Sequence, residues 1–418
     1  MDRTSSSPGR SPNLAVRLTS EALKHVRRGH PWVFAGSITS VRGGRNGDGT
    51  GEPGDVAVIF DDRRRFVAVG LWDPGSQIRV KVLHAGAPRQ VDEALWGDRF
   101  DAAADRREVL ASDPTTTAWR VVHGEDDGLP GVVVDRYGDV AVVKLYSAAW
   151  FAHLEGLLDA IDRRIAPRAT ILRLARTVAA GPLPAGISDG VTLRGSEPAG
   201  PVAFRELGLR FTADVSHGQK TGWFLDQRDN RRRVGELAAG ARVLDVFCCG
   251  GGFTVHAAAG GATHVHSVDL SPHAVAGTAR HLAMNRSIPT VRRVGHRGTV
   301  GDAFEVLTQL GRTGERYDVV VVDPPSFANR RDDVPAALRA YAALSDLAVR
   351  VVGPGGILVQ ASCSSRVSGE DLERSMHSGA ARSGSRLEVV RRTGQPVDHP
   401  ITVADRAYLC AVFARVRR

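Results

Sequence analysis

Apolar residues in the second half of the chain form short runs that alternate with longer amphipathic segments. Residues 317–322 read Tyr-Asp-Val-Val-Val-Val, an apolar run that predicts a strand covered on both faces. Further strands are predicted over residues 263–268, 357–361, 386–390 and 407–416, and helices over residues 225–237, 272–285 and 335–352. Strands that alternate with helices indicate an α/β domain built around a parallel sheet.

Short strands dominate the first part of the chain. They are predicted over residues 14–18, 55–60, 66–71 and 78–83, with a helix over residues 20–28 that begins at Thr19 or Ser20. A second unit opens with a helical pattern over residues 91–111, and its strands then flank an acidic turn. We therefore expect a disordered tail over residues 1–12, a β-rich domain over 13–87, an α+β domain over 88–200 and the doubly wound domain over 201–418.

The strand that begins at Arg242 leads into a turn with three consecutive glycines. The strand carries Asp245, and the turn passes through Gly250 and Gly252 before an alanine-rich, helix-compatible segment. Glycine lets the backbone turn sharply and come close to a ligand, and a doubly wound sheet binds nucleotide-like ligands at this point. The next strand ends in Asp269, where an acid can accept hydrogen bonds from both hydroxyls of a ribose.

The spacing of these glycines separates two ligand classes. A dinucleotide site normally has the pattern G-x-G-x-x-G, in which helix N-terminal amides face a pyrophosphate. Here the glycines are contiguous and Phe253 follows at once. S-adenosylmethionine has no phosphate to bind, so the sequence favours this methyl donor as the cofactor.

Other polar residues are predicted to lie at the same edge of the sheet. Asp302 follows a short strand and is placed to accept a hydrogen bond from an adenine amino group, and Asp323 and Pro324 end the buried strand over residues 317–322. A helix from residue 225 would raise Asp226 and Gln227 toward the ligand. That helix is also compatible with an ordinary amphipathic helix whose arginines face water, but the density of polar residues over 216–231 favours a site.

The charge and the cysteine content indicate what kind of partner the protein binds and in which compartment it lies. The formal net charge is +9 and the pI about 9.9, which suits a polyanion. Arginine carries most of this charge, and a biased genome also produces that preference, so charge alone does not establish RNA binding. The cysteines lack zinc-ligand spacing and indicate a reduced, cytoplasmic protein. The acidic turn near residue 126 is interpreted as solvated rather than as a metal site, and no run approaches the ~20 apolar residues of a membrane span.

Seven motifs together resemble a known family. They occupy residues 28–34, 122–125, 128–131, 218–228, 243–253, 323–325 and 398–400. The chain after Leu14 is similar in these motifs to the large-subunit ribosomal RNA cytosine-C5 methyltransferases with an N-terminal PUA domain. The resemblance implies a PUA domain, an α+β linking domain and a Rossmann-type class I methyltransferase domain that uses S-adenosylmethionine. Two departures are Cys249, where the family usually has an aromatic residue, and Ser326, where many RNA cytosine-C5 enzymes carry a second cysteine.

The resemblance also makes ribosomal RNA of the large subunit the expected partner. In the N-terminal module, cationic side chains and one aromatic are the expected RNA contacts: Arg17, Lys24, Arg27, Arg28 and Trp32. Lys220, in the polar stretch of the third domain, is a further expected contact. Core packing explains Trp32 equally well.

Cys363 is the expected nucleophile. C5 of cytosine is too weakly nucleophilic to attack a sulfonium methyl, but addition of a thiolate to C6 makes C5 enamine-like. Cys363 follows the strand over residues 357–361, and Asp323 would hydrogen-bond the base near N3. Two alternatives stay open: a guanine-nitrogen methyltransferase, in which Cys363 is dispensable, and a non-catalytic RNA-binding assembly factor. The target nucleotide, the base that removes the C5 proton, and the choice between monomer and homodimer also stay open.

Overall fold

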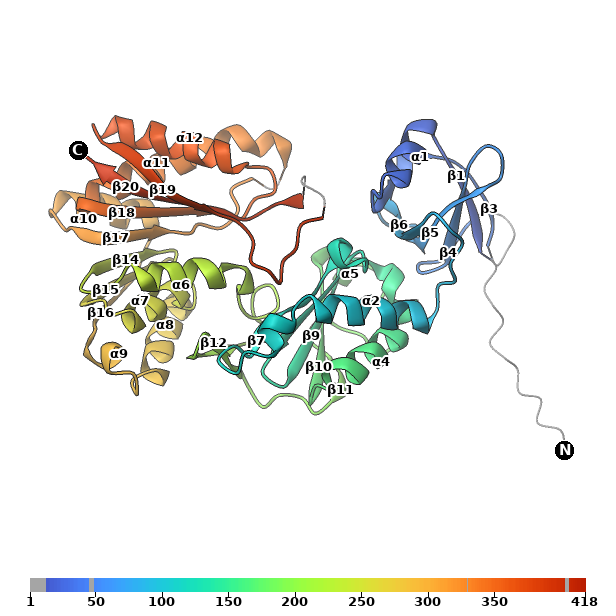
Figure 1. Cartoon of the computed structure of the whole chain (residues 1–418), viewed down its shortest axis with the longest axis horizontal. Coiled ribbons are helices and arrows are strands. Elements are labelled where there is room, and N and C mark those ends of the chain that lie inside the picture. The colour runs from blue at the N-terminus through green and yellow to red at the C-terminus, as the bar shows by residue number, and fades with distance from the viewer. Residues whose placement is uncertain (1–12, 45–48, 329, 403–405) are drawn as a thin grey trace. The chain divides into compact units, whose positions relative to one another are not determined.

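The computed structural model describes residues 13–44, 49–328, 330–402 and 406–418 (Figure 1). The tail predicted over residues 1–12 lies outside the described residues. The chain separates into two compact units. The N-terminal unit comprises residues 1–113, 118–202 and 213–223, and the C-terminal unit comprises residues 114–117, 203–212 and 224–418.

The N-terminal unit begins with a six-stranded sheet of order β2-β6-β5-β4-β1-β3. Its strands are β1 (Leu14–Leu18), β2 (Trp32–Phe34), β3 (Ile38–Gly43), β4 (Val56–Phe60), β5 (Phe66–Trp72) and β6 (Ile78–Ala85). Only the β1–β4 pair is parallel among these described strands. Helix α1 (Ser20–Arg27) begins after the cap Thr19 and buries Leu23 and Val26. The four strands and the helix predicted here are confirmed to within two residues at each end.

A second sheet in the same unit has five strands in the order β11-β10-β9-β8-β7. They are β7 (Ala118–His123), β8 (Val132–Tyr137), β9 (Val140–Leu145), β10 (Ala169–Leu174) and β11 (Thr192–Gly195). Helix α4 (Leu154–Ile165) links the parallel strands β9 and β10 and packs against α2 (Glu93–Asp105). A short helix α5 (Arg176–Ala179) follows β10.

The single helix predicted over residues 91–111 is wrong in one respect, because the structure has two helices there. Helix α2 ends at Asp105 and α3 (Glu108–Ala111) begins after Arg107. The Arg107 side chain is fully buried and donates to both carboxylate oxygens of Asp127 at 2.7 Å. This inward-directed ion pair accompanies the break, and the local sequence pattern contains no sign of it.

The C-terminal unit contains a seven-stranded sheet of order β16-β15-β14-β17-β18-β20-β19. The strands are β14 (Arg242–Val246), β15 (His264–Asp269), β16 (Gly295–Val300), β17 (Tyr317–Val322), β18 (Val352–Ser362), β19 (Arg386–Thr393) and β20 (Cys410–Arg417). Strands β14 to β18 pair in parallel, and β20 is antiparallel to both of its neighbours. The strand order reverses between β14 and β17, which makes a topological switch point at their carboxyl ends.

Helices cover both faces of this sheet, as Figure 1 shows. One layer packs α10 (Ala303–Arg312) against α11 (Val334–Val351), and α11 against α12 (Gly369–Arg382). The other contains α6 (Arg228–Glu236), α7 (Gly252–Ala259), α8 (Pro272–Met284) and α9 (Pro289–Arg293). Separate apolar cores lie on the two faces. The predicted doubly wound α/β fold is confirmed. Among the described residues, none of the helices combines the length and apolarity that a membrane crossing requires.

Candidate active site

The turn after β14 has an unusual backbone. Phe247 and Cys249 adopt positive φ values of 64° and 49°, and Gly251 has φ 77°. Non-glycine residues in this region carry strain, and such residues cluster at functional sites. A Cβ on Gly251 would lie 2.5 Å from Thr278 Cγ2, and one on Gly252 2.5 Å from Arg231 Cδ. Packing against protein side chains therefore requires these two glycines, whatever ligand the turn approaches.

Asp245 is a buried carboxylate directed at this turn. Its Oδ2 accepts from the backbone N and Oγ1 of Thr254 at 3.1 and 2.6 Å. Its buried Oδ1 has no hydrogen-bond partner among the described residues. Burial raises the pKa of Asp245 to about 6, although the Thr254 hydrogen bonds oppose the shift. A buried oxygen without a donor is costly, so this atom suits a ligand that brings a donor or a positive charge, as S-adenosylmethionine does.

Backbone amides orient two further acids. Asp269, the last residue of β15, accepts from Cys249 N through Oδ2 and from Ser271 N through Oδ1, both at 2.9 Å. Each carboxylate oxygen retains a second lone pair for a ribose hydroxyl. Asp302 caps helix α10, with Oδ1 accepting from the backbone N of Phe304 at 2.9 Å. Helix capping alone accounts for an acid at position 302, and its contact with adenine stays a prediction.

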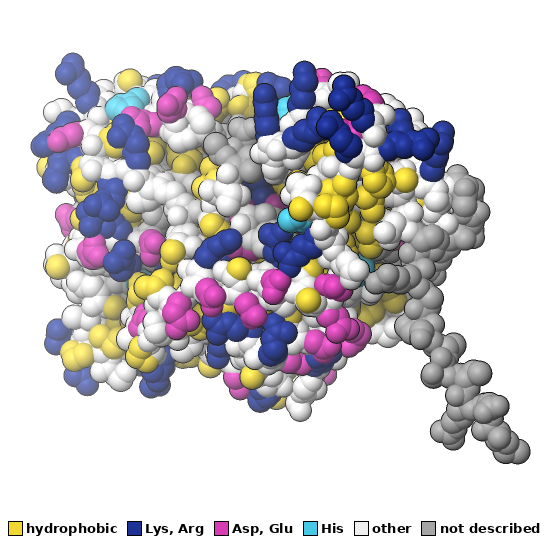
Figure 2. All heavy atoms as spheres, turned by 45° about the vertical axis from the view of Figure 1, so that its right-hand side comes forward, with side chains coloured by type: hydrophobic (Ala, Val, Ile, Leu, Met, Phe, Trp, Pro, Cys, Tyr) yellow, Lys and Arg dark blue, Asp and Glu magenta, His cyan; other side chains and the backbone are white. Residues whose placement is uncertain are grey.

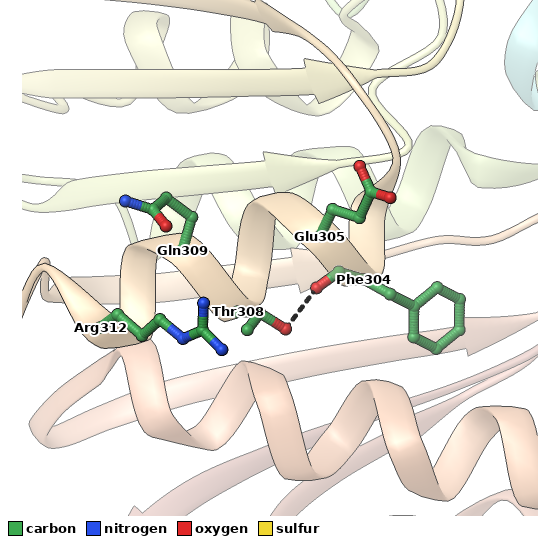
Figure 3. Close-up of a pocket in the computed structure, with 5 residues that line it drawn as sticks. All are labelled: Phe304, Glu305, Thr308, Gln309 and Arg312. Atoms are coloured by element: carbon green, nitrogen blue, oxygen red, sulfur yellow. Dashed lines mark hydrogen bonds between the residues drawn. The ribbon is translucent and has the colours of Figure 1, made fainter.

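A surface hollow of about 470 Å³ runs along α10 (Figure 3). Phe304, Glu305, Thr308, Gln309 and Arg312 line it, and Thr308 Oγ1 donates to Phe304 O at 2.7 Å. Only the Phe304 end adjoins a predicted cofactor residue, because Asp302 caps the same helix. The hollow therefore shows no site separate from the predicted cofactor site.

Gln227 lies beside Asp323. Its Nε2 donates to Asp323 Oδ1 at 2.9 Å, and its Oε1 accepts from Asn230 Nδ2 at 2.6 Å. Thr393 Oγ1 in turn donates to Asn230 Oδ1 at 2.6 Å. Two parts of the chain distant from Asp323, residues 227–230 and Thr393, thus hold its carboxylate. The contact of Gln227 with the cofactor stays a prediction, while its contact with Asp323 is direct.

Asp226 and Cys363 complete the predicted set in this unit. Tyr408 Oη donates to Asp226 Oδ2 at 3.0 Å. Cys363 follows β18, is half-buried, and has its Sγ 4.0 Å from Pro324 O. Strands β17 and β18 are paired with Val322 opposite Gln360, so their carboxyl ends meet. The structure therefore brings Cys363 together with Asp323 and Pro324.

Two buried ion pairs behind the site were missed in the sequence. Arg228 donates to both oxygens of Asp398 at 3.1 and 2.8 Å, and Arg231 to both oxygens of Glu206 at 2.7 and 2.6 Å. The alternative interpretation of α6, with Arg231 to Arg233 facing water, is wrong for Arg231, which like Arg228 is nearly inaccessible to solvent. Arg228 and Arg231 are three residues apart, which places them on one helix face with Val234. This spacing is the sequence feature that could have indicated their burial.

Among the predicted RNA contacts of the N-terminal unit, Lys24 and Arg27 lie on helix α1 and Arg28 caps it. Lys24, Arg27 and Arg28 are exposed, and Arg27 pairs with Asp61 at 3.0 Å. Arg17 on β1 is half-buried. Trp32 lies edge-on to Phe34, with ring centroids 6.4 Å apart, and its Nε1 donates to Glu125 Oε1 at 2.9 Å. Figure 2 shows Lys and Arg side chains gathered beside a hydrophobic area toward the upper right.

Two family models match the chain. One, described as a PUA-like domain, matches residues 16–85, and the other, described as an S-adenosylmethionine-dependent methyltransferase, matches residues 188–415. The chain belongs to the S-adenosylmethionine-dependent methyltransferase family. It is an enzyme of that class with an N-terminal PUA-like domain, and the non-catalytic alternative is set aside.

Relatives of this methyltransferase match over nearly their whole length. A ribosomal RNA large subunit methyltransferase of Deinococcus radiodurans is 44% identical over 97% of this chain and 98% of its own. Ribosomal RNA large subunit methyltransferase I of Tolumonas auensis is 34% identical over 92% of this chain and 94% of its own. A Streptococcus mutans structure, described as a candidate SAM-dependent methyltransferase, is 20% identical with a TM-score of 0.78, covering 96% of this chain and 99% of its own. At that identity the likeness concerns the fold.

Proposed function

We propose that the methyltransferase modifies C5 of a cytosine in large-subunit ribosomal RNA through a covalent bond between Cys363 and C6 of the base. The names of the relatives support large-subunit ribosomal RNA as the substrate. The single observation that carries the cytosine mechanism is the approach of Cys363 Sγ to Pro324 O at 4.0 Å, at the joined ends of β17 and β18. A thiol beside an Asp-Pro-Pro turn suits nucleophilic addition to a base held by Asp323.

In the proposed reaction, the Cys363 thiolate adds to C6, and the electrons of the C5–C6 double bond shift to make C5 nucleophilic. C5 would take up the electrophilic methyl group that bound S-adenosylmethionine supplies, so that the C5–methyl bond forms as the sulfur–methyl bond breaks and S-adenosylhomocysteine is the leaving group. A base then removes the C5 proton, and those electrons expel the Cys363 thiolate and restore the double bond. The target base has to be unpaired or extruded from its helix to reach these residues.

Asp323 would bind the cytosine near N3, and Gln227 would act as a positioning residue. The Gln227 amide donates to Asp323 Oδ1 and so orients the carboxylate. Asn230 fixes the direction of the Gln227 amide, because it donates to Gln227 Oε1. Ser326, whose Oγ donates to Ala328 O at 3.2 Å, is held within its own turn, so we do not propose it as the base for the C5 proton.

A trapping experiment tests this proposal. Large-subunit ribosomal RNA transcribed with 5-fluorocytidine has no C5 proton at its cytosines, so the adduct should persist. We expect a protein–RNA band on denaturing gels that depends on S-adenosylmethionine, and 5-methylcytidine in digests of the unsubstituted RNA after reaction. Cys363→Ala should lose the band and at least about a thousandfold in turnover, while keeping cofactor affinity.

Cys410→Ala is the matched control. Cys410 is also half-buried and lies opposite Ser362 in the β18–β20 pairing, one residue from the proposed nucleophile. It should keep both the band and turnover. Near-normal methylation by folded Cys363→Ala would end the cytosine-C5 mechanism and favour a guanine-nitrogen enzyme, which methylguanosine in the digest would identify.

A further inference from the structure

The loop over residues 216–223 is anchored on three adjacent strands of the five-stranded sheet. Arg173 on β10 donates to Val215 O at 3.2 Å and to Gly218 O at 3.1 Å. Lys144 on β9 donates through Nζ to Lys220 O at 3.3 Å. On β8, the Asp135 carboxylate accepts from Thr221 Oγ1 at 2.6 Å. The N-terminal unit therefore holds this loop in one conformation.

The backbone of the loop needs this support. Lys220 has φ 53° and Gly222 has φ 123°, and a Cβ on Gly218 would lie 2.3 Å from Asp214 O. A lysine in the left-handed region costs conformational energy that the surrounding contacts have to offset. The fold thus fixes the backbone of a cationic residue at a defined place beside β9.

Tyr146 is an exposed aromatic ring at the same place. It follows β9 directly, and 53% of its surface is exposed. Its backbone N donates to Gly131 O at 2.8 Å, and the next residue, Ser147, is buried and donates to Asp73. The ring therefore projects from a backbone that is fixed on both sides.

Cations surround this ring. Lys144 Nζ lies 5.6 Å from the ring centroid. Burial of the hydroxyl end raises the pKa of Tyr146, while Arg120 and Lys220 lie close enough to lower it. The nearby acids have partners of their own, because Asp135 pairs with Arg120 at 2.8 Å and Glu125 accepts from Trp32. Lys144 thus places a positive charge over one face of the ring, and Lys220 is a second cation nearby.

We propose that Tyr146 is a stacking platform for an unpaired base of the substrate RNA, with Lys144 and Lys220 beside the neighbouring phosphates. This proposal rests on the proposed function for RNA as the substrate, and it adds a contact surface outside the PUA-like domain. Exposed aromatics flanked by cations bind single-stranded RNA because every base has a face that can stack and every linkage has a charge.

The test uses the full-length protein and fluorescence anisotropy with a short, unstructured, fluorescein-labelled RNA. Tyr146→Phe should bind within about twofold of the wild type, because the ring is kept. Tyr146→Leu and Tyr146→Ala should each bind about tenfold more weakly, with an unchanged salt slope, because stacking releases no counterions. Lys220→Gln should make the slope shallower by about one. Val109→Ala, which truncates a side chain that is 63% exposed in the same unit, is the matched control and should bind normally.

Wild-type affinity in folded Tyr146→Ala, or in Tyr146→Leu, would overturn the stacking role. The result of this binding experiment can be distinguished from the result of the trapping experiment that tests the proposed function. If the RNA binds through Tyr146 but no 5-methylcytidine forms, the platform stands and the cytosine mechanism fails. If 5-methylcytidine forms and Tyr146→Ala binds normally, only the platform fails.

Discussion

The candidate active site of the C-terminal unit and the surface around α1 use charge in opposite ways. Behind the candidate active site, Glu206 and Arg231 are buried and joined by two hydrogen bonds. Around α1, Lys24 and Arg28 are exposed. Buried pairs are rigid and strongly coupled. The interactions of exposed cations, in contrast, are largely screened by salt at separations beyond about 10 Å. The first arrangement suits a site that has to hold reacting atoms in place, and the second suits affinity for a polyanion of any sequence.

Removing one partner of the buried pairs should have the largest effect on folding. Burial alone would raise the pKa of Glu206, but Arg231 and His256 lower it to about 2. Glu206→Ala leaves Arg231 buried without its carboxylate and should cost about 3–5 kcal/mol of unfolding free energy. Denaturant titration measures this loss.

The same variant has a pH signature. A carboxylate whose pKa is lowered on folding stabilises the protein above its unfolded pKa near 4.5, and this stability disappears as the pH falls toward 2. The difference between wild type and Glu206→Ala should therefore shrink on acidification. Glu236→Ala, which removes an exposed pair with Arg233, should cost less than about 1 kcal/mol. Equal losses in the two variants would contradict the comparison.

Asp245→Asn should separate stability from function. Burial raises the pKa of Asp245 to about 6, so the folded state binds its proton more tightly than the unfolded state. The wild type therefore loses stability as the pH rises from about 4 to 6. At pH 7.5 the neutral variant should be more stable by about 2–3 kcal/mol, and near pH 3 the advantage should vanish.

The same substitution should weaken cofactor binding, because Asp245 Oδ1, which has no hydrogen-bond partner among the described residues, is the acceptor we expect the ligand to use. Thermal unfolding without cofactor and calorimetry with S-adenosylmethionine measure the two effects. A variant that is less stable than the wild type at pH 7.5 and binds the cofactor normally would refute both parts.

Asp269→Ala tests an acid that is oriented but not strongly paired. It should lose at least about 1 kcal/mol of binding free energy for S-adenosylmethionine, the scale of a charge-assisted hydrogen bond. Isothermal calorimetry on the folded variant measures the change. Glu305→Ala, which removes an exposed acid on α10, should leave the affinity unchanged. Unchanged affinity in Asp269→Ala would remove this residue from the cofactor site.

The smallest effect on folding should come from the surface around α1. Replacing Lys24 and Arg28 together by Gln should change the unfolding free energy by less than about 0.5 kcal/mol, because both side chains are exposed. It should make the salt dependence of RNA binding shallower by about two, one for each phosphate contact. Arg89→Gln serves as the control, because the Arg89 side chain is already paired with Asp98. An unchanged slope would count against RNA binding by this surface.

The sequence alone predicted the elements whose pattern is local. Strands β1, β14 and β17 follow from apolar runs, and the acids Asp245 and Asp269 lie in β14 and at the end of β15, as their positions indicated. The glycine-rich turn was also evident, because positive φ values and close packing leave a direct trace in residue type. These features depend on neighbours a few residues away, which a linear pattern contains.

Tertiary structure decided which polar residues meet. Arg228 pairs with Asp398, 170 residues later, and Gln227 donates to Asp323, 96 residues later. The spacing on α6 places Arg228 and Arg231 on one face with Val234, but it does not identify the acids that pair with them, because other elements supply those acids. The loop over residues 216–223 shows the same limit, since its anchors come from three strands that lie side by side only in the folded sheet. Local preferences set the elements, whereas long-range packing determined which charges are buried and paired.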